Sequence, residues 1–253
     1  MGQKWPDKII LIRHGESARN LRKEQLKRSA PDIHVWTDEG RDQDTPLTER
    51  GILQAQAVGK YLALTEPQLQ TLFVSPYKRT RQTVEQILKA FSSRTTSGPT
   101  TSGPTTSSRT ASGQTGRSKG VPRTIVEERI REIDFGVFDG LTSKGIKATY
   151  PGEYERRERT GKYWYRPPGG ESRPDVALRI HSFLGTLTRD YQRKTVVVVA
   201  HSVVVLCFRR LLERWGEDEY LLVDKEDDVK NCSLTTYLCR ENRMVLESYN
   251  KVV

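Results

Sequence analysis

Short apolar runs that end abruptly at a charged or histidine residue constrain the fold of this chain most strongly. Residues 8–12 (KIILI) end at Arg13, and residues 196–200 (VVVVA) end at His201. Short runs rich in β-branched residues are typical of strands that are buried on both faces of a sheet. Residues 71–74 and 124–126 have the same character. We therefore expect a buried sheet with polar residues at one edge.

Helical patterns lie between these expected strands. Thr48 is placed to cap a helix that runs to about residue 64. Ser75 and Pro76 have the residue types of an N-cap and first helical position, which predicts a helix to about residue 91. Ser172 opens another helix, with Asp175 at the capping-box position.

The remaining pattern completes the expected topology. A helix is predicted over residues 203–215, and a closing strand pair over 234–238 and 244–248. Strands separated by helices imply right-handed crossovers and helices on both faces of the sheet. We therefore predict an α/β fold with a mostly parallel central sheet.

One segment differs from the rest in composition. Residues 92–120 read SSRTTSGPTTSGPTTSSRTASGQTGRSKG, with TSGPT repeated at 96–100 and 101–105. A segment without large apolar residues cannot offset its ordering entropy by burial. We expect a single domain over residues 1–253 that carries 92–120 as a disordered low-complexity insert. A role of the insert in phosphorylation or partner binding is left open.

Composition and cysteine usage bear on the compartment. Apolar residues make up 35% of the chain, and the longest apolar run, 196–206, is interrupted by His201 and Ser202. That run is too short to cross a bilayer, and the N-terminus shows no apolar signal segment. The cysteines, at 207, 232 and 239, form no CxxC pair. We expect a cytoplasmic protein, with the nucleus as the alternative, and no membrane partner.

In parallel sheets the active site lies beyond the carboxyl ends of the strands. Arg13 and His14 follow the first expected strand, and His201 follows the strand at 196–200. Arg79 stands in the first turns of a helix that follows another strand, and Glu132 comes shortly after the third. We expect these side chains to share one crevice.

This set of residue types indicates phosphoryl transfer. The arginines and a second histidine can neutralise a phosphoryl group while His14 attacks phosphorus through a ring nitrogen. Glu132 can protonate a leaving alkoxide if its surroundings raise its pKa. No metal-ligand spacing, Walker A motif or kinase glycine loop is evident, so we expect neither metal nor cofactor.

The net charge of +10 is compatible with nucleic acid or with an anionic substrate as partner. Because the basic residues are scattered rather than clustered with aromatic residues, we expect no nucleic-acid partner. The other histidines, His34 and His181, are interpreted as ordinary loop and helix residues.

Several motifs then resemble those of a known family. RHGExxxN spans Arg13 to Asn20, and Arg131-Glu132 to Gly136 is similar to an REIxxG acid motif. The others, in chain order, are PLTxxG with QA at 46–55, SPxxRTxxT at 75–83, GGES at 169–172 and VVxH at 198–201. Together they resemble the histidine phosphatase superfamily, the phosphoglycerate-mutase-like proteins, in its broad-specificity phosphatase branch.

The resemblance implies a three-layer α/β/α sandwich and a metal-independent reaction. It implies that His14 is the phosphohistidine nucleophile and that Glu132 is the acid for the leaving group and then the base for water. The catalytic pocket would also contain Arg13, Arg79 and His201. The substrate-binding residues would be Arg13, Asn20, Arg79, His201 and Ser202.

The chain departs from the family pattern in places. Ser202 stands where the family usually has glycine, and we expect a modest effect because a backbone N–H remains there. Residues 21–44 form a long polar connection, including Trp36, that we expect to fold over the site. The aromatic stretch 163–168 fits packing against the sheet and contact with substrate equally well.

The motifs favour a phosphomonoesterase acting on a small phosphorylated substrate, with a phosphoprotein as a further option. A phosphoglycerate-type mutase is the first alternative, although the tryptophan-containing FTGWxD stretch of such mutases is missing. A catalytically weak interaction protein that keeps the fold is the second. The oligomeric state does not follow from the sequence.

Overall fold

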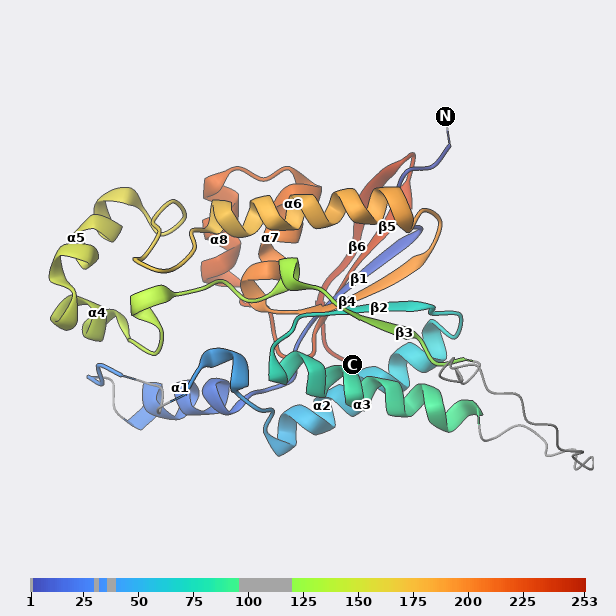
Figure 1. Cartoon of the computed structure of the whole chain (residues 1–253), viewed down its shortest axis with the longest axis horizontal. Helices are drawn as coiled ribbons and strands as arrows, with labels where there is room; N and C mark the ends of the chain where they lie inside the picture. The colour runs from blue at the N-terminus through green and yellow to red at the C-terminus, as the bar shows by residue number, and fades with distance from the viewer. Residues whose placement is uncertain (1, 30–31, 36–39, 96–119) are drawn as a thin grey trace, which may run out of the picture.

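The computed structural model describes residues 2–29, 32–35, 40–95 and 120–253. Their strands form a six-stranded sheet in the order β3-β2-β4-β1-β5-β6 (Figure 1). Strands β3, β2, β4 and β1 are parallel, whereas β5 and β6 are antiparallel to their neighbours. The strands are β1 (Lys8–Arg13), β2 (Thr71–Val74), β3 (Arg123–Val126), β4 (Thr195–Ala200), β5 (Leu234–Arg240) and β6 (Arg243–Lys251).

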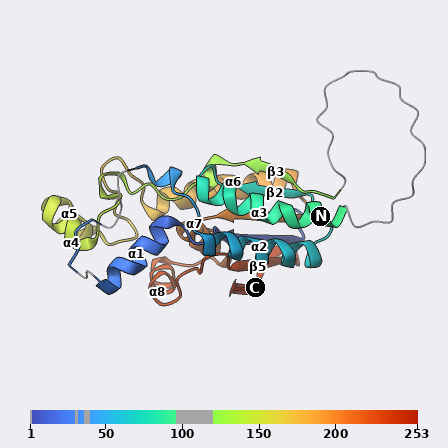
Figure 2. The same ribbon diagram turned by 90° about the horizontal axis from the view of Figure 1, so that it is seen from below.

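Helices cover both faces of this sheet, so the predicted α/β/α sandwich is confirmed. Helices α2 (Glu49–Thr65) and α3 (Lys78–Thr95) lie on one face, and α6 (Arg173–Asp190) and α7 (Ser202–Glu213) on the other (Figures 1 and 2). Further helices lie toward one end of the sandwich: α1 (Ala18–Ser29), α4 (Ser143–Thr149), α5 (Pro151–Thr160) and α8 (Glu217–Glu226).

Alternation along β1 shows why two helical layers form. Ile9 and Leu11 belong to the hydrophobic core beneath α6 and α7, whereas Ile10 and Ile12 belong to the core beneath α2 and α3. Successive side chains of a strand point to opposite faces, so a strand that is apolar at every position requires a cover on both sides.

The expected strands, the closing hairpin and two helix caps are confirmed. The Thr48 hydroxyl accepts a hydrogen bond from Gly51 N, and Ser172 forms a capping box with Asp175. The helix predicted to start at Ser75 and Pro76 starts later, because α3 begins at Lys78, so that predicted start is wrong. The hydroxyl of Ser75 bonds to His201 Nε2 at 2.7 Å and also accepts from Tyr77 N at 3.5 Å, but no helix starts at Pro76.

The sequence patterns did not reveal α1, α4, α5 or α8. Helix α5, PGEYERRERT, has no buried residue, so it lacks the apolar stripe on which a helix prediction depends. Helix α1 occupies the first part of the connection predicted over 21–44.

Helix α3 runs through Thr95, beyond the predicted start of the insert at Ser92. The rest of that insert, residues 96–119, lies outside the described residues, as does Trp36. Within the ranges given above, no helix is long and apolar enough to cross a membrane.

Candidate active site

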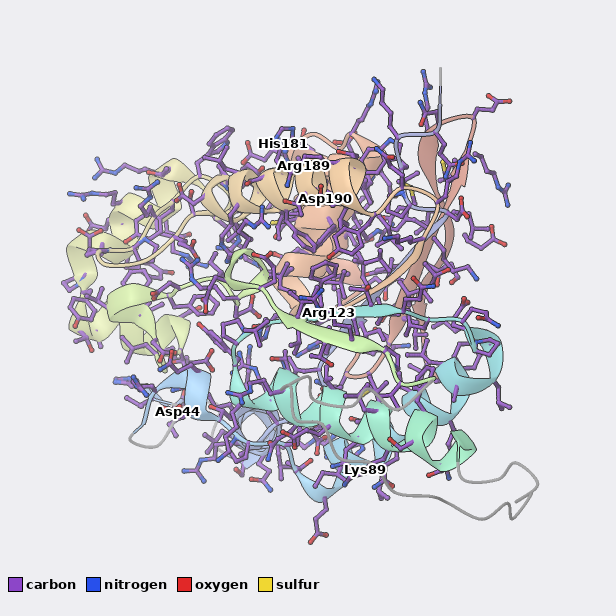
Figure 3. All side chains as sticks on the ribbon, turned by 45° about the vertical axis from the view of Figure 1, so that its right-hand side comes forward. Asp44, Lys89, Arg123, His181, Arg189 and Asp190 are labelled. Carbon is purple, nitrogen blue, oxygen red and sulfur yellow. The ribbon has the colours of Figure 1, made fainter. Side chains whose placement is uncertain are left out.

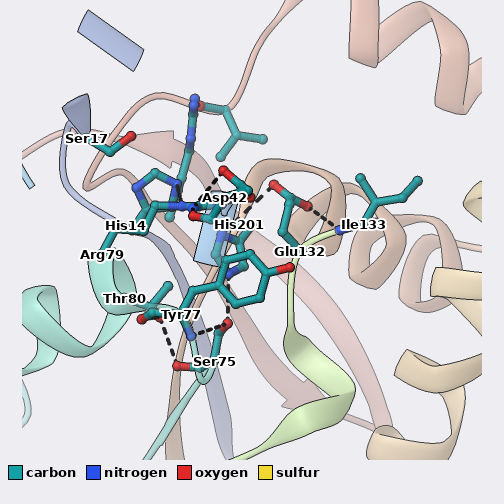
Figure 4. Close-up of polar contacts among 12 residues, drawn as sticks. His14, Ser17, Asp42, Ser75, Tyr77, Arg79, Thr80, Glu132, Ile133 and His201 are labelled. Atoms are coloured by element: carbon teal, nitrogen blue, oxygen red, sulfur yellow. Dashed lines mark hydrogen bonds and ion pairs between the residues drawn. The ribbon is translucent and has the colours of Figure 1, made fainter. Parts of the chain in front are cut away.

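The carboxyl ends of the parallel strands β1, β2 and β4 lie side by side. Figure 4 shows His14, Arg79, Glu132 and His201 gathered close together. His14 N donates to Ala200 O at 3.0 Å, and Ser75 N donates to Val199 O at 3.1 Å, so the sheet hydrogen bonding continues into the site. The rings of His14 and His201 lie edge to face, with centroids 5.2 Å apart. The predicted convergence of the two histidines is therefore observed.

His14 is held in a definite protonation state. Its Nδ1 lies 2.7 Å from the carbonyl oxygen of Gly15, and because a carbonyl only accepts, Nδ1 carries the proton. Its Nε2 then presents a lone pair, which accepts from Arg79 Nε at 3.2 Å. Burial, reinforced by the charges of Arg79 and Arg13, lowers the pKa of His14 well below its usual value. The imidazole is thus neutral and suited to act as a nucleophile.

The two predicted arginines flank this imidazole but differ in their partners. Arg13 donates through Nη1 to Val229 O and lies 3.7 Å from Asp228, while its buried Nε has no partner in the described part of the chain. Arg79 is 4% exposed, and its guanidinium is paired with Asp42. Asp42 belongs to the connection 21–44 that was expected to fold over the site, but the sequence did not single it out.

Glu132 lies beside His201, on the side of the histidine pair away from Arg79 (Figure 4). Its Oε1 accepts from Ile133 N at 2.9 Å, and its Oε2 lies 4.0 Å from His201 Nδ1. Burial raises the pKa of Glu132, opposed by the charge of Arg79. The carboxyl group therefore keeps its proton to a higher pH than an exposed glutamate, as a general acid requires.

His201 is fully buried, and a hydrogen bond to the hydroxyl of Ser75 orients its ring. Its Nε2 lies 2.7 Å from Ser75 Oγ, and its Nδ1 faces Glu132 without a hydrogen-bond partner among the described residues. Burial, with Arg79 next in effect, lowers the pKa of His201 well below its usual value. The ring of Tyr77 packs against His201 at 5.0 Å and beneath the guanidinium of Arg79 at 4.8 Å.

Close backbone packing positions the nucleophile loop. A Cβ atom on Gly15 would lie 2.4 Å from Gly51 O, so the loop packs on the start of α2 too closely for any side chain at Gly15. Gly15 N donates to Thr83 Oγ1 at 3.1 Å, and Glu16 N donates to Gln54 Oε1 at 2.9 Å. The RHG, PLTxxG and SPxxRTxxT motifs therefore meet around one loop.

Asn20 serves the same loop in this structure. Its Oδ1 accepts from Ser17 N, Ser17 Oγ and Asn231 Nδ2 at 3.0–3.2 Å. Asn231, which the sequence did not single out, also donates to His14 O at 3.0 Å. Asn231 reaches this loop because β5, which starts shortly after it, pairs Leu234 with Ile12 at the carboxyl end of β1, and no local pattern in the sequence indicates that pairing. The substrate-binding role of Asn20 remains a prediction.

A cleft of about 730 Å³ opens beside the site. Arg13 and Ser202 form part of its lining, and the aromatic wall consists of Phe135, Phe138 and Tyr165. Tyr165 stacks on Phe138 at 5.7 Å. From the aromatic stretch 163–168, Tyr163 is instead buried against Tyr220. The stretch therefore contributes Tyr163 to the hydrophobic core and Tyr165 to the cleft wall, and its contact with substrate stays a prediction.

The remaining histidines lie away from the site. His181 is exposed on the outer side of α6, and His34 contacts Thr142 through its backbone carbonyl (Figure 3). Among the described side chains, no group of three His, Cys, Asp or Glu is placed to hold a metal ion.

The histidine phosphatase superfamily (branch 1) family model matches residues 9–99 and 106–252. The chain therefore belongs to this superfamily, as its motifs predicted, and the predicted enzyme class agrees with that assignment.

Among curated proteins, the chain is 32% identical over 85% of its length to the phosphoglycerate mutase-like protein AT74 of Arabidopsis thaliana, spanning 60% of that protein. It is 28% identical over 78% of its length to phosphoserine phosphatase 1 of Hydrogenobacter thermophilus, spanning 71% of it.

Solved structures show the same fold. A putative α-ribazole-5′-P phosphatase from Escherichia coli superposes with a TM-score of 0.68 at 17% identity, covering 98% of both chains. A mycobacterial glucosyl-3-phosphoglycerate phosphatase in complex with VO3 superposes with a TM-score of 0.65 at 24% identity, covering 96% of this chain and 98% of that one.

Proposed function

We propose that this chain is a metal-independent phosphomonoesterase that works through a phosphohistidine on His14. One observation carries the proposal: a neutral, buried imidazole accepts at Nε2 from the buried Arg79 and packs against His201, and the carboxyl group of Glu132, whose pKa is raised, lies 4.0 Å from that second histidine. A neutral nucleophile, a cation for the phosphoryl oxygens and a protonated acid are the groups that phosphate-ester cleavage requires.

The steps follow from these positions. His14 Nε2 forms a bond to phosphorus while the ester P–O bond breaks, and Glu132 transfers its proton to the leaving oxygen. Glu132, now a carboxylate, then takes a proton from water as the water oxygen attacks phosphorus and the P–N bond breaks. Arg13, Arg79 and His201 stabilise the phosphoryl oxygens in both steps.

The cleft beside the site supports a small anionic substrate. Basic lining residues outnumber acidic ones, and the aromatic wall offers contact to a leaving group. A phosphoprotein presenting a phosphorylated side chain is the alternative. The basic side chains of the cleft are Arg13, Lys23, Lys144, Arg157, Lys162 and Arg173.

Hydrolysis of a chromogenic phosphate ester by the wild type and by His14→Ala tests the proposal. We expect turnover by the wild type, retained in the presence of a chelator, and acid-labile labelling of His14 after rapid quenching. Activity that survives in His14→Ala would refute the mechanism. Transfer to an acceptor hydroxyl in preference to water would instead favour the mutase, and an inactive wild type would favour an interaction protein.

We further propose that residues 1–253 form one domain with residues 92–120 as an insert, without a nucleic-acid or membrane partner. We also propose a cytoplasmic location. The three cysteines are free thiols in the structure, which supports a reducing compartment. Subcellular fractionation tests the location.

A further inference from the structure

The guanidinium of Arg79, expected to bind phosphate, is already occupied by a carboxylate of the same chain. Arg79 Nη1 donates to Asp42 Oδ1 at 3.1 Å and to Asp42 O at 2.7 Å, and Nη2 donates to Asp42 Oδ2 at 2.9 Å. Figure 4 shows the Asp42 side chain directed at Arg79. This two-pronged geometry is the one that an arginine uses for a phosphate group.

The two histidines of the site are shielded from solvent in this arrangement. The third nitrogen of the Arg79 guanidinium, Nε, donates to His14 Nε2. His14 is 3% exposed and His201 is fully buried. The neighbouring cleft is lined by Arg13 and Ser202 but not by His14. A phosphoryl group therefore needs the guanidinium edge that Asp42 holds.

The segment that carries Asp42 has a second cation to which it can remain bound. Arg19 Nη1 lies 3.2 Å from Asp42 Oδ1 and 2.7 Å from Asp139 Oδ1, and Arg19 Nη2 donates to Gly40 O at 2.9 Å. Breaking a buried ion pair is costly when it leaves one charge without a partner. Release of Arg79 leaves Asp42 paired with Arg19, so this cost is reduced.

We propose that Asp42 is an internal competitor for the phosphate pocket, which the phosphoryl group of the substrate displaces from Arg79. This inference rests on the proposed function, since it assigns the pocket to a phosphoryl group. Only molecules with Asp42 released bind phosphate, so the apparent affinity is reduced by the released fraction. Asp42 thereby sets how much phosphate ester is needed to open the site.

Calorimetric titration with inorganic orthophosphate tests this inference on the full chain. Asp44→Asn is the matched control, because Asp44 belongs to the same 3₁₀ helix, Asp42–Asp44, and its carboxylate pairs with the exposed Arg41. We expect Asp42→Asn to bind orthophosphate about fivefold more tightly or better. We expect Asp44→Asn to stay within about twofold of the wild type, because a surface ion pair contributes little.

Orthophosphate affinity of Asp42→Asn that is equal to or below that of the wild type would overturn the inference, since Asp42 would then only position Arg79. An equal gain in Asp44→Asn would also overturn it, because the gain would come from net charge. Phosphate binding is measured without turnover. An inactive wild type would therefore count against the proposed function, whereas the affinity comparison would still decide the role of Asp42.

Discussion

Replacing Gly51 by alanine probes how tightly the nucleophile loop is packed against α2. A Cβ atom on Gly51 would lie 2.1 Å from Glu16 O and 2.9 Å from both Glu16 N and Glu16 C. These are backbone atoms, so no side chain can rotate away. Relieving an overlap of this size requires the loop or the helix to move by about 1 Å.

The free energy follows from two opposing contributions. Alanine in place of glycine within a helix stabilises by about 0.5–1 kcal/mol. Overpacking of this kind costs about 1–3 kcal/mol, so Gly51→Ala is expected to lower the free energy of unfolding by up to about 2.5 kcal/mol. A misplacement of about 1 Å in the reacting groups can reduce kcat by about 100-fold. We therefore expect Gly51→Ala to show a large decrease in kcat although most of the protein remains folded.

Urea denaturation and hydrolysis of a chromogenic phosphate ester measure both effects. Gly185→Ala is the matched control, because Gly185 is exposed within α6 and a Cβ there meets no atom within 4 Å. We expect Gly185→Ala to stabilise by about 0.5–1 kcal/mol and to leave activity unchanged. A Gly51→Ala protein with the stability and kcat of Gly185→Ala would refute the reasoning.

The contacts of the active site and of the core also predict a pH dependence of activity and the effects of three further substitutions. Burial lowers the pKa of His14 from its usual 6.5, so kcat/KM should decrease as the pH is lowered through that depressed pKa and His14 becomes protonated. Burial raises the pKa of Glu132 from its usual 4.5, so kcat/KM should also decrease as the pH is raised through that elevated pKa and Glu132 loses its proton. Glu132→Gln should lose the high-pH limb in a pH–rate profile; a profile identical in shape to that of the wild type would argue against the acid role. Thr83→Val orphans the N–H of Gly15 and should cost about 1–3 kcal/mol by urea denaturation, whereas Thr83→Ser should cost less. Phe183→Ala removes a fully buried ring beside Phe73 and should cost about 3–5 kcal/mol in the same assay, and a loss below about 1 kcal/mol would contradict the packing described.

Local patterns were sufficient for much of the site. The strand at 196–200 is apolar at every position, and His201 follows it directly. The position of His201 at the carboxyl end of the sheet therefore does not depend on the conformation of the loops. The same logic places His14 after β1. The cap at Ser172 was predictable because its hydrogen bonds span only three residues.

The start of α3 and the role of Asn231 could not be predicted in this way. Ser75 has the residue type of a cap, but its hydroxyl bonds to His201, which follows β4 far along the chain. Asn231 contacts His14 only because β5 lies beside β1. Such pairings have no periodicity and no local spacing, so a linear pattern carries no sign of them.

The amino-acid sequence by itself determined the alternation of buried strands with helices, and with it which side chains emerge at the carboxyl edge. It also determined the residue types that suit phosphoryl transfer. Only the tertiary structure decided that Asp42 forms an ion pair with Arg79 and that Asn231 and Thr83 form hydrogen bonds with the nucleophile loop. The physical reason is that periodic burial is written into neighbouring residues, whereas a polar contact between distant segments exists only after the sheet has assembled them.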